Sequence, residues 1–118
     1  MAKLIVEQQD MSVETLERLR AHGVVENVTL LRLDFQFDAA GQSEAEELAD
    51  FLGQSTDYDV DVTRGPRKGL RRGWIVGGHT QQTPVSPEIL DDWIRWMVMA
   101  GAEHGECRFD GWGAFASA

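Results

Sequence analysis

Residues 28–38 alternate apolar and polar side chains, and this alternation is the clearest strand signal in the 118-residue chain. The positions read, in order, Leu31, Arg32, Leu33, Asp34, Phe35, Gln36 and Phe37. Because successive side chains of a strand point to opposite faces, one face here is apolar and the other polar. Such a strand belongs to a sheet that is covered on one side only, which favours antiparallel pairing.

Three amphipathic helices are predicted from capping signals followed by apolar residues at helical spacing. Their ranges are 12–22, 43–52 and 87–104. The first begins at Ser12, and the second begins at Ser43 and Glu46, a capping-box pair. The third begins at Ser86, whose hydroxyl precedes a proline at the first helical position. Residues 1–11 show no clear period and are interpreted as a short strand or a loose arm.

Three further strands are predicted at 58–63, 74–82 and 106–110. From residue 28 the order is strand, helix, strand, strand, helix, strand. We therefore expect an α+β fold of the ferredoxin-like, split βαβ type (βαββαβ), with a four-stranded antiparallel sheet and both helices on one face. The helix at 12–22 is an N-terminal addition, and 1–118 is one domain. A competing interpretation is a three-stranded sheet with an irregular segment at 74–80.

The formal net charge of −9 comes from 20 acidic and 11 basic residues. This balance argues against binding to a nucleic-acid backbone and suits contact with a basic protein segment. A single cysteine, Cys107, excludes an internal disulfide and fits a reducing, cytoplasmic setting, with the thiol buried. No apolar stretch approaches the ~20 residues of a membrane span, so no membrane segment is expected.

No catalytic, metal or cofactor motif is legible, so the chain is interpreted as a non-enzyme. The histidines His22, His79 and His104 show no ligand spacing, and the first and last precede helix-ending glycines, where a ring can cap free carbonyls. The loop 64–73 holds five of the eleven basic residues but lacks the G-x-x-x-x-G-K-[ST] phosphate-binding pattern. It is either a solvated hairpin tip or a docking patch for an acidic protein or RNA.

The stretch 107–115 begins as a strand and is interrupted by Asp110 and Gly111. Glycine inside a strand indicates a bulge or a close approach of another backbone. A bulge would fix the direction of Trp112, which either fills the end of the core or anchors a partner.

The run Phe109-Asp110-Gly111-Trp112-Gly113, closing a strand after a long amphipathic helix, resembles the DGWG strand of the regulator of ribonuclease E activity B family. The order of elements over residues 12–115 is similar to that family as well. The resemblance implies a ferredoxin-like fold and a non-catalytic protein that binds the endoribonuclease of the bacterial RNA-degradation machinery. This chain departs from the family in its basic loop and in ending at Ala118 without a long acidic tail.

The sequence hypothesis is a cytoplasmic, non-catalytic regulator that acts through contact with an endoribonuclease E-like protein, without cofactor, membrane or direct nucleic-acid binding. The candidate partner-binding residues are Asp110, Gly111, Trp112, Gly113, Arg67, Lys68, Arg71 and Arg72. One alternative is a small-ligand-sensing domain or enzyme with a pocket between the sheet and the N-terminal helix. Another is a domain that self-associates through its open sheet face or an edge.

Overall fold

This computed structural model describes residues 2–66 and 72–114, which form three helices and two antiparallel sheets. In chain order the elements are α1 (Ala2–Ala21), β1 (Leu30–Leu31), β2 (Leu33–Ala39), α2 (Gln42–Ser55), β3 (Asp59–Pro66), β4 (Arg72–His79), β5 (Thr83–Pro84), α3 (Pro87–Glu103) and β6 (Arg108–Ala114). The expected α+β class is confirmed.

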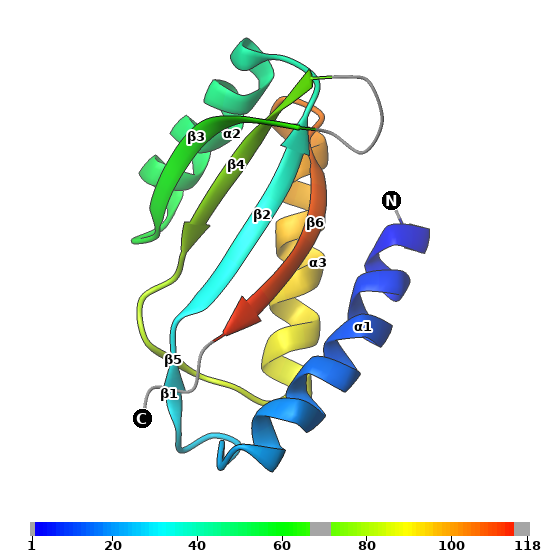
Figure 1. The fold of residues 1–118 in the computed structure, drawn as a ribbon, viewed down its shortest axis with the longest axis vertical. Helices are drawn as coiled ribbons and strands as arrows, with labels where there is room; N and C mark the ends of the chain where they lie inside the picture. The colour runs from blue at the N-terminus through cyan, green and yellow to red at the C-terminus, as the bar shows by residue number, and fades with distance from the viewer. Residues whose placement is uncertain (1, 67–71, 115–118) are drawn as a thin grey trace.

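The larger sheet has the strand order β3-β4-β2-β6, and each neighbouring pair is antiparallel. The strands β2 and β4 are central neighbours, as predicted for 28–38 and 74–82, but β2 begins only at Leu33 and β4 ends at His79. The three-stranded alternative is wrong, because Gly77 and Gly78 pair with both β2 and β3. The helices α2 and α3 lie behind this sheet, and α1 lies beside the edge strand β6 (Figure 1). The remaining two-stranded sheet joins β1 to β5.

Alternation along β2 divides the sheet into a covered and an open face. Phe35 and Phe37 are buried against α2 and α3, whereas Asp34 and Gln36 are exposed. A second apolar cluster joins α1 to the start of α3 through residues such as Leu16, Leu19 and Leu90. Trp93 and Trp112 pack against both clusters and connect them.

The N-terminal helix is longer than its sequence pattern indicates. Residues 2–11, expected as a short strand or loose arm, form the first half of α1. Ser12 is not an N-cap but a buried residue within this helix, 4% exposed. The apolar pattern is hidden because two buried positions, Gln8 and Ser12, carry polar side chains. Hydrophobic spacing alone therefore could not locate the start of α1.

Only one of the two predicted side-chain caps on the later helices is observed. The Ser86 hydroxyl accepts a hydrogen bond from the Ile89 amide at 3.1 Å, as predicted. At α2 the N-cap is Gly41, which makes no side-chain cap bond. The expected capping box is wrong because the Ser43 hydroxyl donates to the Glu44 carboxylate at 3.2 Å instead.

Candidate functional site

The edge strand β6 contains a bulge at Asp110. Phe109 pairs with Phe37 and Gly111 with Gln36, so Asp110 is an extra residue without a partner on β2. Gly111 has a φ of +137°, a conformation that glycine adopts readily and other residues rarely. The bulge predicted from the Asp-Gly interruption is therefore present.

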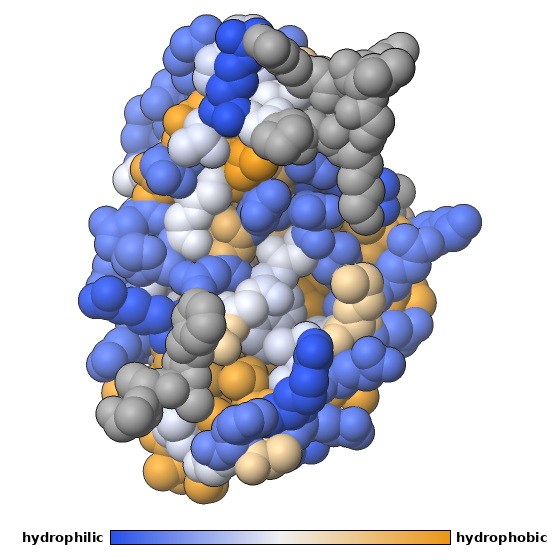
Figure 2. All heavy atoms as spheres, viewed as in Figure 1, coloured by the Kyte–Doolittle hydropathy of each residue, from blue (hydrophilic) through white to orange (hydrophobic). Residues whose placement is uncertain are grey.

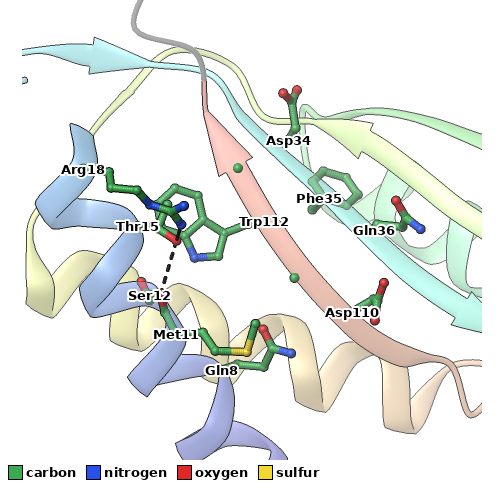
Figure 3. Close-up of a pocket in the computed structure, with 12 residues that line it drawn as sticks. Gln8, Met11, Ser12, Thr15, Arg18, Asp34, Phe35, Gln36, Asp110 and Trp112 are labelled. Atoms are coloured by element: carbon green, nitrogen blue, oxygen red, sulfur yellow. Dashed lines mark hydrogen bonds between the residues drawn. The ribbon is translucent and has the colours of Figure 1, made fainter. Parts of the chain in front are cut away.

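The bulge reverses which residues of β6 face the helices. Trp112 now opposes the buried Phe35, while Gly113 opposes the exposed Asp34. The half-buried Trp112 ring meets Trp93 edge-on, with centroids 6.2 Å apart and an interplanar angle of 82°. Its indole points from β6 towards α1 (Figure 3). Trp112 is thus first a packing residue, and part of its surface lines a neighbouring hollow.

The side of α1 turned to β6 is mostly polar, with Met11 as its apolar member. It carries Gln8, Ser12, Thr15 and Arg18, whose spacing of four, three and three residues places them on one helical face. The Gln8 side-chain amide donates to the Phe109 carbonyl at 3.4 Å. This bond satisfies a backbone group of an edge strand, and α1 shields an edge that could otherwise pair with another chain.

A hollow of about 380 Å³ lies between this side of α1 and the sheet. We call it the α1–β6 groove. Its strand lining is Asp34, Phe35, Gln36, Asp110, Gly111, Trp112 and Gly113. A second hollow of about 470 Å³ adjoins it and shares Thr15, Arg18, Trp112 and Gly113. A pocket between the sheet and the N-terminal helix, expected under the ligand-sensing alternative, is therefore present.

The uncovered side of the larger sheet, which we call the open face, is rich in carboxylates. The strand register places on it Asp34, Gln36, Asp38, Asp59, Asp61, Thr63, Ile75, Gly77, His79, Arg108, Gly111 and Gly113. The His79 Nε2 lies 2.8 Å from the Asp59 Oδ2. Figure 2 shows this face as mostly hydrophilic, with a paler strip at its centre. The excess of aspartate agrees with the net charge of −9.

Only part of the predicted basic loop lies within the described residues. Arg67, Lys68 and Arg71 lie outside the described residues. Arg72 begins β4 and pairs through its backbone with Pro66. The structure brings together the four predicted β6 residues, but it does not relate the loop cations to them. Sequence reasoning missed the α1 side of the groove, and the only signal for it was the helical spacing of polar residues.

The cysteine is buried, and the described parts of the chain hold no cluster of metal-binding side chains. Cys107 is 3% exposed and its thiol donates to the Glu44 carbonyl at 3.5 Å. Burial, with smaller contributions from Glu44 and Glu47, raises the pKa of Cys107 to about 11, so a reactive thiolate is not favoured. Across residues 2–66 and 72–114, no three His, Cys, Asp or Glu side chains cluster for a metal.

His22 and His104, both expected to cap helix ends, make different contacts. The His22 Nδ1 lies 2.7 Å from the Arg18 carbonyl, in agreement with a capping role at the end of α1. The His104 ring instead stacks on Phe51, with centroids 3.6 Å apart. Neither position indicates a metal ligand.

No helix within the described segments is both long and apolar enough to cross a bilayer. A scan against protein-family models and a search of curated proteins found no match to this chain. The case for a function therefore rests on the geometry of the open face and groove, together with the resemblance of the β6 motif.

Proposed function

We propose that this protein is a non-catalytic, cytoplasmic regulatory domain that binds a basic segment of a protein partner on the open face of its sheet. The resemblance of the β6 motif makes an endoribonuclease E-like enzyme the first partner to test. The observation that carries the proposal is a broad sheet face left uncovered by α2 and α3 and lined by aspartates (Figure 1).

The arrangement of elements supports a ferredoxin-like architecture for this domain. The strand order β3-β4-β2-β6, with α2 connecting β2 to β3 and α3 connecting β4 to β6, is the order expected of two interleaved βαβ units. In this view α1 is an addition that extends one side of the open face.

The charges on the open face favour a cationic partner. Asp34 and Asp61 on this face, and Asp110 at the neighbouring bulge, are exposed and form no ion pair with any described residue, while Asp59 pairs with His79. A lysine- or arginine-rich segment would neutralise these carboxylates and be steered towards them, which raises association rates. A nucleic-acid backbone would be repelled by the same charges.

The test is a titration of the protein with purified ribonuclease E, in which binding affinity is measured by biolayer interferometry at low and high salt. The double variant Asp34→Asn/Asp61→Asn should weaken binding by about tenfold or more, because it removes two charges from the contact surface. The matched control, Glu14→Gln/Glu17→Gln, removes the same charge from the outer side of α1 and should change affinity by less than about twofold.

Equal losses in both double variants would show that net charge, and not this face, determines binding. An unaltered protein that does not bind the ribonuclease would refute the assigned partner. A second measurement, the rate of RNA cleavage by the ribonuclease, should fall when the unaltered protein is added and recover with the open-face variant.

A further inference from the structure

The floor of the α1–β6 groove is polypeptide backbone. Gly111 and Gly113 both face the open side of β6, so no side chain rises from either position. A Cβ added at Gly113 would meet no heavy atom within 4 Å, and one added at Gly111 would meet only the Gln8 Oε1 at 3.8 Å. Another chain can therefore approach this floor closely, a common use of glycine.

The groove is elongated along β6. Gln8 lies at one end, near Phe109, and Arg18 lies at the other, where the adjoining hollow reaches Ala114. At 1.5 Å per helical residue, Gln8 and Arg18 are separated by about 15 Å along α1. An extended polypeptide rises about 3.3 Å per residue, so this length matches about four or five residues of an extended chain.

The neutral groups lining the groove suit a peptide backbone. The Gln8 and Gln36 amides and the Ser12 hydroxyl each carry donors and acceptors, whereas the Thr15 hydroxyl donates to the Met11 carbonyl at 3.3 Å and serves as an acceptor. A peptide presents alternating N–H donors and C=O acceptors, which such groups can satisfy. Arg18, which donates to Thr15 at 3.5 Å, can also donate to a backbone carbonyl of a bound chain.

The charged groups determine which peptide fits. Asp110 and Asp34 lie on the sheet side of the groove and point away from α1 (Figure 3). Neither carboxylate pairs with a cation within residues 2–66 and 72–114. Lysine or arginine side chains on a bound chain would meet these two carboxylates.

From these observations we infer that the α1–β6 groove holds an extended, basic segment of a partner's polypeptide chain, with the segment's backbone against α1 and its cationic side chains on Asp34 and Asp110. The inference rests on the proposed function and specifies how the basic segment is recognised. The adjoining hollow lets the ligand continue beyond Arg18, which suits a chain better than a compact small molecule.

The test uses a short fluorescein-labelled peptide in which arginine alternates with alanine, with binding followed by fluorescence anisotropy at low salt. Gly113→Leu adds a side chain above the groove floor without a steric conflict at its Cβ. Thr63→Leu, the matched control, adds the same side chain on the open face but on the far edge strand β3. We expect Gly113→Leu to weaken binding by at least about tenfold and Thr63→Leu by less than about twofold.

Two further measurements separate folding from binding. Circular dichroism melting curves of both variants should resemble that of the unaltered protein. In an NMR titration, the amides of Gly111 and Gly113 should shift on peptide addition, and the amide of Thr63 should shift less.

Unchanged peptide binding in Gly113→Leu, with loss in Asp34→Asn/Asp61→Asn, would overturn the groove assignment and leave the proposed open-face function intact. Competition by free arginine amide as effective as competition by unlabelled peptide would overturn it in favour of a small-ligand pocket. Absence of peptide binding to the unaltered protein would also refute the groove inference, while the ribonuclease titration decides the proposed function separately.

Discussion

The covered and open faces of the larger sheet are built from the same four strands, yet they have opposite properties. On the covered face the fully buried rings of Phe37 and Phe109 lie with centroids 5.2 Å apart. On the open face Gln36, the residue before Phe37 on β2, is exposed and lies opposite Gly111. Stability is therefore concentrated on one face, and the other can carry charge and glycine at little cost to folding.

The most severe test of this division compares two adjacent residues of β2. Phe37→Ala should lower the free energy of unfolding by about 3–5 kcal/mol, because it removes a fully buried ring and leaves a cavity. Gln36→Ala should change it by less than about 0.5 kcal/mol, as expected of an exposed position. Urea denaturation followed by circular dichroism measures both, and comparable losses would contradict the division.

Trp112 lies where the two faces meet, and an intermediate effect is expected. Trp112→Ala should cost about 2–3 kcal/mol, less than a fully buried aromatic residue, because the ring is only half-buried but connects both apolar clusters. Trp96→Ala, which removes an indole 38% exposed on α3, should cost about 1 kcal/mol or less in the same urea experiment. A loss of partner binding in Trp112→Ala would thus not identify a contact, whereas Gly113→Leu avoids this ambiguity.

The buried thiol gives the covered face a dependence on pH. Burial raises the pKa of Cys107 from 9.0 to about 11, so the folded chain keeps a proton that the unfolded chain loses first. The contribution of this thiol is complete below the unfolded pKa and is lost as pH rises through the folded pKa. Unfolding free energy should fall by up to about 1.4 kcal/mol per pH unit in this window, and by about 2.7 kcal/mol over the two units of the shift.

Urea titrations over that pH window should be run in parallel on the unaltered protein and on Cys107→Ala. The difference between the two slopes isolates the thiol, because other alkaline titrations, including that of Tyr58, are common to both proteins. Parallel pH profiles would show that burial does not raise the pKa of Cys107 in the folded protein.

Local patterns were sufficient for those parts of the fold in which each residue type agrees with its position. The alternation in β2 predicted both faces of the sheet, and the Asp-Gly interruption predicted the bulge in β6. The first half of α1 and the groove could not be predicted this way. Gln8 is buried because it donates to Phe109, 101 residues away, and no local pattern of apolar residues reports such a contact.

The direction of the Trp112 side chain could not be predicted from the sequence either. Glycine in the strand indicated a bulge, but the side to which the indole turns depends on the register with β2, where Trp112 opposes Phe35. The capping box at Ser43 was wrong for a different and local reason. Its hydroxyl had a neighbouring carboxylate, that of Glu44, as a competing acceptor.

The smallest expected effect is also the one in which local propensity and packing disagree. Gly53 in α2 has no atom within 4 Å of an added Cβ, so Gly53→Ala should stabilise the protein by about 0.5–1 kcal/mol.

Gly101 in α3 faces the covered side, where an added Cβ would lie 2.5 Å from the Cys107 carbonyl oxygen and 2.9 Å from the Phe37 ring. Neither group can move easily, because one is backbone and the other is a fully buried side chain. Gly101→Ala should therefore cost about 1–2 kcal/mol despite the higher helix propensity of alanine. Thermal denaturation of the two variants should give shifts of opposite sign. Stabilisation by both would show that α3 can move away from the sheet and that the covered face is not tightly packed around Gly101.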